Sequence, residues 1–389
     1  MAPPLKIYFD YAAATPVDPA VLRAMRPYFL AKFGNAGSLH SFGQEAMAAL
    51  DRSREVIANS IGADFREIIF TGSATEADNL AVRGVLERSR IKTPKIIVSS
   101  IEHESVLETV RDLERSRSAE VVFLSVNRRG VIDLKELKNA LDERVVLVSL
   151  IYANNEIGTV QPIMEAVNII KNFRKKGPGL LFHTDAAQAF QFLNCDVAEL
   201  GIDLMTLSSH KIYGPKGVGA LYVHASDGNA TLRPSFTGGG QEFGLRSGTE
   251  NIPAIVGFAK AVELLASSRK LASKRIEELR KELWRGIKKT YPKAEINGVL
   301  SVDDSLPNIL NVFFPGRHAQ DLLTKFDLNG LAVSSGSACR ARAAQSSYVI
   351  EALGHSKERA MSSIRFSLGR PTTKEEVVRA LQIIKKAAG

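Results

Sequence analysis

The chain has 389 residues, of which 45% are hydrophobic and 24% charged, and this composition excludes a disordered chain and a small disulfide-stapled scaffold. The length is typical of two or three domains. Two cysteines exclude a disulfide framework, and the net charge of +9 allows weak attraction to acidic partners. No apolar run approaches the ~20 residues of a membrane helix, and Asp10 comes too early for a secretory signal, so we expect a cytoplasmic protein.

Between about residues 40 and 225, short apolar runs alternate with longer amphipathic segments. The runs rich in β-branched residues predict strands at residues 67–70, 95–99, 120–126, 145–152, 180–184, 203–207 and 219–223. Helical spacing of apolar residues predicts helices at 42–60, 75–90 and 163–175. This alternation predicts an α/β fold in which helices cover both faces of a mostly parallel sheet.

After about residue 255 the pattern changes to a long helix followed by a shorter mixed region. Strands are expected near 308–314 and 332–334, an alternating strand carries Arg365, and a terminal helix begins at Lys374. The pattern predicts a second, smaller α+β domain.

The most basic stretch of the chain spans residues 269–293. Its apolar residues recur at helical spacing, at Ile276, Leu279, Leu283 and Ile287. We therefore interpret the stretch as an amphipathic helix with a solvated basic face, and we do not expect direct nucleic-acid binding.

Polar residues follow the predicted strands one after another. In chain order they are Thr71 to Glu76, Glu102 to Glu104, Asn154 to Glu156, His183 to Asp185 with Gln188, and Ser208 to Lys211. Each group alone could be a helix cap or a turn. Because ligands of open α/β sheets bind at the carboxyl ends of the strands, the five groups together predict a binding site at one sheet edge.

These residue types match the requirements of pyridoxal 5'-phosphate (PLP). The turn that includes Ser73 offers N–H groups and hydroxyls to a phosphate, and Asp185 would favour a protonated ring nitrogen. His103 could stack on a flat ring, and Lys211 could form a Schiff base if its amine is partly desolvated. The sequence has no GxGxxG after the first strand, no GxxxxGK[ST] and no HExxH, so dinucleotide, P-loop and metal sites lack their signatures.

A second cluster, residues 334–342, reads SSGSACRAR. Small residues suit a mobile loop, and neighbouring arginines lower the pKa of a thiol such as Cys339 toward the reactive thiolate. A buried cysteine on a serine-rich turn is the structural alternative. Cys195 has no comparable setting and is expected to be a packing residue. Arg365 could grip a carboxylate through its guanidinium or form a structural ion pair.

The chain resembles the NifS/IscS-like cysteine desulfurases, in the class-V aminotransferase family of fold-type-I PLP enzymes. The segments that carry the resemblance are 8–16, 33–35, 70–79, 102–103, 153–158, 183–188, 209–217, 246–250, 334–339 and 364–370. The resemblance implies a large PLP-binding domain with a seven-stranded, mostly parallel sheet. We expect an N-terminal arm at 1–15, the large domain at 16–260 and a small C-terminal domain at 261–389.

The same resemblance implies roles for the residues that hold the cofactor. Lys211 would form the Schiff base with PLP, Asp185 would pair with the pyridine nitrogen, and His103 would stack on the ring. The phosphate and ring-oxygen contacts would come from Ala74, Thr75, Asn155, Gln188, Ser208, Ser209 and His210. Thr249 would reach the phosphate of a neighbouring subunit, which implies a homodimer.

For the reaction, the resemblance implies that Arg365, with Asn155, binds the carboxylate of L-cysteine, and that Lys211 and His103 move protons. Cys339 would take the sulfur as a persulfide, leaving L-alanine, and pass it to an iron–sulfur scaffold or a thiolation enzyme. The loop at 335–347 would be flexible, although its Arg340 and Arg342 depart from the usual pattern of relatives. Two alternatives stay open: another PLP-dependent lyase or aminotransferase, such as a selenocysteine lyase, and a non-catalytic basic binding protein.

Overall fold

The computed structural model describes residues 6–174, 179–224, 232–301, 303–336 and 346–388. Its centre is a seven-stranded sheet with the strand order β2-β8-β7-β6-β5-β3-β4. The strands are β2 (Ile68–Thr71), β3 (Lys95–Ser99), β4 (Glu120–Leu124), β5 (Val145–Ser149), β6 (Leu181–Asp185), β7 (Leu204–Ser208) and β8 (Gly219–Val223). In this sheet β8 runs antiparallel to its two neighbours, whereas the other paired strands are parallel.

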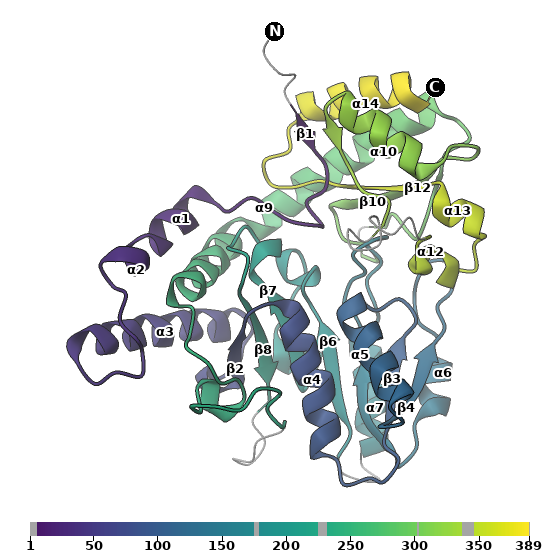
Figure 1. The fold of residues 1–389 in the computed structure, drawn as a ribbon. Coiled ribbons are helices and arrows are strands. Elements are labelled where there is room, and N and C mark those ends of the chain that lie inside the picture. Colours follow the sequence, from purple (N-terminus) through teal and green to yellow (C-terminus); the bar gives the residue numbers. More distant parts are fainter. Residues whose placement is uncertain (1–5, 175–178, 225–231, 302, 337–345, 389) are drawn as a thin grey trace.

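Helices cover both faces of this sheet (Figure 1). The helices of its first half are α3 (Ser41–Ser60), α4 (Ala74–Arg88), α5 (Glu104–Arg115), α6 (Leu134–Ala140), α7 (Ile163–Arg174) and α8 (Val197–Leu200). Alternate strand residues enter different cores: Ala220 of β8 belongs to the cluster with α3 and α7, and Leu221 belongs to the cluster with α4 and α5. Successive residues of a strand point to opposite faces of the sheet, and here both faces are buried. The strands therefore appear in the sequence as continuous apolar runs.

The long helix α9 (Ile252–Thr290) joins two hydrophobic cores. Its first half packs on the cluster of the large sheet through Ile255 and Phe258. Its second half contributes the predicted apolar face, Ile276, Leu279, Leu283 and Ile287, to a separate cluster. The helix runs without a break across residue 260, where the sequence predicts a domain boundary, and that boundary stays a prediction.

The carboxy-terminal part is built around a three-stranded antiparallel sheet of order β12-β10-β9. Its elements are β9 (Glu295–Ile296), β10 (Ile309–Phe313), α10 (Ala319–Leu328), α12 (Tyr348–Ala352), α13 (Lys357–Met361), β12 (Ser363–Ser367) and α14 (Lys374–Ala388). Near the amino terminus, β1 (Ile7–Tyr8) pairs in parallel with β11 (Leu331–Ala332). The amino-terminal segment therefore lies against the carboxy-terminal part of the chain.

Two short helices, α1 (Pro19–Met25) and α2 (Pro27–Leu30), lead to α3 on a projecting lobe (Figure 1). The α/β class, the mostly parallel sheet and the strand that carries Arg365 are confirmed. The predicted strands at 95–99 and 219–223 match to the residue. Within the described part of the chain, no helix is both long enough and apolar enough to cross a membrane.

Candidate active site

A cavity of about 240 Å³ lies at the carboxyl ends of the large sheet's strands. Its lining residues come from the segments after β2, β3, β5, β6 and β7, together with the amino-terminal segment and β12. They are Ala12, Ala13, Ser73, Ala74, Thr75, Asp78, His103, Ile151, Asn155, Asp185, Ala187, Gln188, Ser208, His210, Lys211 and Arg365. The polar groups that follow successive strands in the sequence thus meet at one place.

The turn from β2 into α4 presents the amino-terminal end of that helix to the cavity. Ser73 is the N-cap, and its hydroxyl accepts a hydrogen bond from the Glu76 N–H at 3.1 Å. A Cβ at Gly219 of β8 would lie 2.7 Å from the Ser73 carbonyl carbon, so only glycine lets β8 approach this turn. Helix N-termini attract anions through their N–H groups and dipole, and this one suits a phosphate.

Lys211 lies in η3 (Ser209–Lys211), the short helix after β7. Its Nζ donates hydrogen bonds to the carbonyls of Ala12 at 2.6 Å and Ala13 at 2.8 Å. The turn is tight, since a Cβ on Gly214 would come within 2.1 Å of the Ser209 hydroxyl. The carbonyls of Ala12 and Ala13, in the amino-terminal segment, thus hold the Lys211 amine in the cavity.

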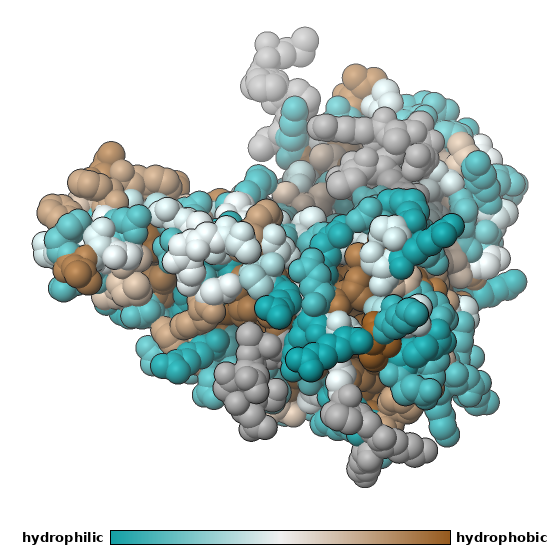
Figure 2. Space-filling model, turned by 60° about the horizontal axis from the view of Figure 1, so that its bottom comes forward, coloured by the Kyte–Doolittle hydropathy of each residue, from teal (hydrophilic) through white to brown (hydrophobic). Residues whose placement is uncertain are grey.

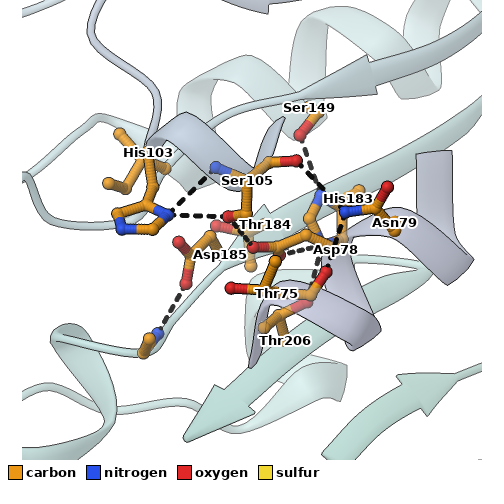
Figure 3. A network of polar contacts seen from close by, with 12 residues as sticks. Thr75, Asp78, Asn79, His103, Ser105, Ser149, His183, Thr184, Asp185 and Thr206 are labelled. Atoms are coloured by element: carbon orange, nitrogen blue, oxygen red, sulfur yellow. Dashed lines mark hydrogen bonds and ion pairs between the residues drawn. The ribbon is translucent and has the colours of Figure 1, made fainter. Parts of the chain in front are cut away.

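Asp185 ends β6 and lies beside His103 (Figure 3). One of its oxygens accepts the N–H of Ala187 at 2.8 Å. Burial raises the pKa of Asp185, and the nearby His103 and Lys211 oppose that rise. A cation placed against this carboxyl, such as a protonated ring nitrogen, would stabilise its ionised form.

A buried polar network lies behind Asp185 (Figure 3). His103 Nδ1 lies 2.7 Å from Ser105 Oγ, which lies 2.5 Å from Asp78 Oδ2. His183 Nε2 lies 3.6 Å from Asp78 Oδ1, and burial lowers the pKa of His183 to about 3. The sequence prediction missed Asp78 and Ser105, which look there like ordinary helix residues; their only signal is polarity on a helix face that is otherwise apolar.

Arg365 of β12, which is 1% exposed, also lines the cavity. Its guanidinium donates to the Asn155 carbonyl at 2.9 Å and to Asp10 at 2.7 Å. Among the described residues, Arg365 Nε and the Asn155 side-chain oxygen have no hydrogen-bond partner. Arg365 therefore forms the structural ion pair that the sequence analysis considered, and its role in binding a carboxylate stays a prediction.

The remaining predicted residues lie partly in the cavity and partly outside it. Ser208 and His210 line the cavity with their side chains 3.2 Å apart, and Gln188 donates to the Ala12 carbonyl at 2.9 Å. Burial and the neighbouring Lys211 lower the pKa of His210 to about 4, so it is neutral at pH 7. Ser209 is buried outside the cavity lining.

Thr249 is exposed and lines a different hollow, together with Gly72 and Arg246. Cys339 and most of the loop predicted at 335–347 lie outside the described residues. Cys195 is 2% exposed within the main hydrophobic cluster, as expected of a packing residue.

The cavity fits PLP by the chemistry of its donors. One space is surrounded by a helix N-terminus for the phosphate, a carboxyl for the ring nitrogen, a flat imidazole and a lysine amine. The side-chain oxygen of Asn155 also lines it and has no hydrogen-bond donor among the described residues. One atom each of Asp78, His103 and Asp185 also lies within 4.8 Å of the others, a spacing that metal ligands share. A metal there would need Asp78 to be ionised, and burial raises its pKa well above the usual range.

Comparisons with known proteins agree with this geometry. The family model described as aminotransferase class-V matches residues 7–380. The mitosomal cysteine desulfurase of Trachipleistophora hominis is 46% identical over 379 residues, which cover 96% of this chain and 84% of that protein. A NifS-like protein of known structure superposes with a TM-score of 0.90 at 37% identity, covering 98% of this chain and 99% of that one. A structure of SspA in complex with cysteine has a TM-score of 0.81 at 36% identity, covering 94% and 99%.

Proposed function

The chain belongs to the class-V aminotransferase family and is a cysteine desulfurase within it; we propose that it uses PLP to convert L-cysteine to L-alanine and transfers the sulfur to Cys339. The observation that carries this proposal is a cavity that brings Lys211 and Asp185 together with Arg365, whose Nε has no hydrogen-bond partner among the described residues. The lysine and the carboxyl serve a PLP cofactor, and the arginine serves an amino-acid carboxylate.

Four groups of this chain would hold the cofactor. The N–H groups at the start of α4, with the side chains of Thr75, Ser208 and His210, would bind the phosphate. Asp185 would face the ring nitrogen, and His103 would lie against the ring. Lys211 would attach the cofactor covalently through Nζ.

When bound, PLP supplies an electron sink that stabilises negative charge at the substrate's Cα. The chain's residues would supply the remaining chemistry. Arg365 would bind and orient the carboxylate of L-cysteine. Lys211, held by backbone carbonyls beside the cavity, would move the proton at Cα.

Cys339 would take the sulfur from the substrate. Its thiolate forms a bond to the substrate sulfur while the bond between that sulfur and Cβ breaks, and the electron pair goes to the carbon skeleton. Protonation of the skeleton gives alanine, and Cys339 keeps the sulfur as a persulfide. We propose that the next acceptor is another protein, an iron–sulfur scaffold or a thiolation enzyme.

We further propose a homodimer that works in the cytoplasm. Apolar side chains gather on the projecting lobe of α1, α2 and α3 (Figure 2). The exposed ones include Leu22, Phe29, Leu30, Phe33, Leu39 and Phe42. Such an apolar surface supports burial against a second subunit. Thr249, exposed and outside the cavity of its own chain, would then be free to reach the partner's phosphate site.

The test is the stoichiometry of products from purified, PLP-loaded protein. With L-cysteine and a reducing thiol we expect equal amounts of alanine and sulfide, and L-selenocysteine serves as the comparison for a selenocysteine lyase. Cys339→Ser should abolish both products while cofactor binding stays unchanged. Alanine formation at the native rate by Cys339→Ser would refute the assignment.

The second thiol provides an internal control for persulfide labelling. Burial raises the pKa of Cys195 to about 12, so its thiolate is scarce at pH 8. We therefore expect alkylation after one turnover to modify Cys339 alone, as read by peptide mass. Sulfur found on Cys195 would contradict the scheme.

A further inference from the structure

Two opposed residues of the sheet of β9, β10 and β12, here called the small sheet, hold the loop that carries Asn155. Arg365 of β12 and Asn311 of β10 face each other in the register of the antiparallel pair. The Arg365 guanidinium donates to the Asn155 carbonyl at 2.9 Å. The side-chain amide of Asn311 donates to the next carbonyl, that of Glu156, at 3.1 Å. Two successive carbonyls of one loop are therefore bound by directly neighbouring residues of the small sheet.

Asn154 shapes the same loop from the side of the large sheet. Its side-chain oxygen accepts the N–H groups of Glu156 at 2.9 Å and Ile157 at 3.0 Å, which makes an Asx turn. Its amide donates to the Ile101 carbonyl at 2.9 Å. The N–H groups of the loop are thus bound from the large sheet and its carbonyls from the small sheet.

A chain of hydrogen bonds continues from Asn311 away from the cavity. Asn297, next to β9, donates from its amide to the Asn311 side-chain oxygen at 2.8 Å. The Asn297 oxygen accepts from Nε of Arg359, in α13, at 2.6 Å. Arg359 in turn pairs with the exposed Glu295. Since the two asparagines are only 1% and 2% exposed, this chain connects an ion pair at the surface with the buried loop beside the cavity.

Arg359 fixes the orientation of both amides. A guanidinium Nε–H can only donate, so the side-chain oxygen of Asn297 must face Arg359 and its nitrogen must face Asn311. The oxygen of Asn311 then faces Asn297, and its nitrogen faces the Glu156 carbonyl. The reverse orientation of either amide would bring two oxygens or two nitrogens together and leave buried polar atoms without a partner.

We propose that Asn311 is a positioning residue for binding of the substrate's carboxylate, and that Asn297 and Arg359 orient its amide. Asn311 does not line the cavity, whereas Asn155 and Arg365 both do. It acts by holding the loop in the place where the Asn155 carbonyl meets Arg365. The inference rests on the proposed function, because Arg365 is the residue proposed to bind that carboxylate.

The test compares L-cysteine with cysteamine, which lacks the carboxylate, by the change in cofactor absorbance of PLP-loaded protein in a Cys339→Ser background. Asn311→Leu removes the amide at similar size. Arg359→Met removes the terminal donor, and Arg359→Lys restores a group that can only donate. Asn308→Leu is the matched control, because Asn308 is also 2% exposed and lies just before β10 but does not line the cavity.

Asn311→Leu should weaken binding of L-cysteine about tenfold and leave binding of cysteamine unchanged. Arg359→Met should reduce the preference for L-cysteine about threefold, whereas Arg359→Lys and Asn308→Leu should keep it. In an Arg365→Lys background, Asn311→Leu should cause little further loss, because both changes act on the same carboxylate contact. An unchanged preference in Asn311→Leu, or a full tenfold loss on top of that of Arg365→Lys, would overturn the inference.

Amide hydrogen exchange of the chain without PLP separates this inference from the proposed function. We expect the N–H groups of Glu156 and Ile157 to exchange about tenfold faster in Asn311→Leu than in Asn308→Leu, as read on peptides that cover residues 153–158. Absence of alanine from L-cysteine in the wild type would remove the proposed function, while the exchange would still measure whether Asn311 holds the loop. Unchanged exchange in Asn311→Leu would overturn the inference, and a wild type that forms alanine would then keep its proposed function.

Discussion

Replacement of Arg365 by lysine tests the substrate side of the cavity. In the structure the guanidinium is tied to Asp10 and to the Asn155 carbonyl, and its Nε has no partner among the described residues. A guanidinium can keep these two contacts and still bind a carboxylate through its other N–H groups, since it has five. A lysine ammonium at the same place carries its charge on one nitrogen and cannot keep the contacts to Asp10 and the Asn155 carbonyl while it binds a carboxylate.

The size of the effect follows from these contacts. A hydrogen bond to a charged group contributes about 1.5–3 kcal/mol, and Arg365→Lys should lose one of the two that a bidentate grip makes. A loss of about 2 kcal/mol weakens L-cysteine binding about 30-fold. Cysteamine, which is cysteine without its carboxylate, should bind the variant and the parent equally.

The assay is the change in cofactor absorbance on ligand addition, in a Cys339→Ser background that stops turnover. Arg280→Lys is the matched control, because Arg280 is also 1% exposed but donates to the Leu306 carbonyl, away from the cavity. It should lower stability and leave the preference for L-cysteine over cysteamine unchanged. If Arg365→Lys weakens both ligands by the same factor, Arg365 does not bind the carboxylate and our reasoning is wrong.

Two further predictions concern buried carboxyls. Ser347→Ala removes a hydroxyl that donates to Glu156 at 2.5 Å and caps α12, and we expect this variant to form alanine about tenfold more slowly. Ser356→Ala removes the cap of the similar helix α13 and should change only the stability of the protein. Equal rates of alanine formation in the two variants would contradict this prediction. Burial raises the pKa of Glu102 to about 8, so the folded chain keeps a proton there that the unfolded chain releases above pH ~4.5, and stability falls as pH rises between these values. Glu102→Gln keeps the acceptor for the Ile151 N–H but does not titrate. Its free energy of unfolding in urea, relative to that of the wild type, should therefore rise by a few kcal/mol from pH 5 to pH 8.5. A difference that stays constant over this range would show that Glu102 is ionised.

The sheet could be predicted because each buried strand leaves a local trace. The run 145–149 is apolar on both faces and is followed within a few residues by Asn154 and Asn155. Polar residues just past such runs mark the carboxyl edge of a parallel sheet, so the location of the site follows from the strands alone. The antiparallel direction of β8 leaves no such trace, because its five residues are all buried and such a run looks the same in either direction.

The network around His103 could not be predicted in the same way. Ser105 and Asp78 lie on two helices and meet only because α4 and α5 pack side by side on the sheet. In the sequence, each is one polar residue in an amphipathic helix. Which helical faces meet depends on crossing geometry that the spacing of apolar residues does not encode.

The amino-terminal segment shows why the site needs the whole chain. Its Ala12 and Ala13 carbonyls hold the Lys211 amine, and its Asp10 pairs with Arg365, which lies 355 residues away in sequence. The same segment enters the carboxy-terminal part, where β1 pairs with β11. One stretch of backbone thus joins the lysine of the large sheet to the arginine of the small sheet. Both cations contact this stretch, so its position sets the distance between Lys211 and Arg365, the proposed attachment point of the cofactor and the proposed carboxylate-binding residue.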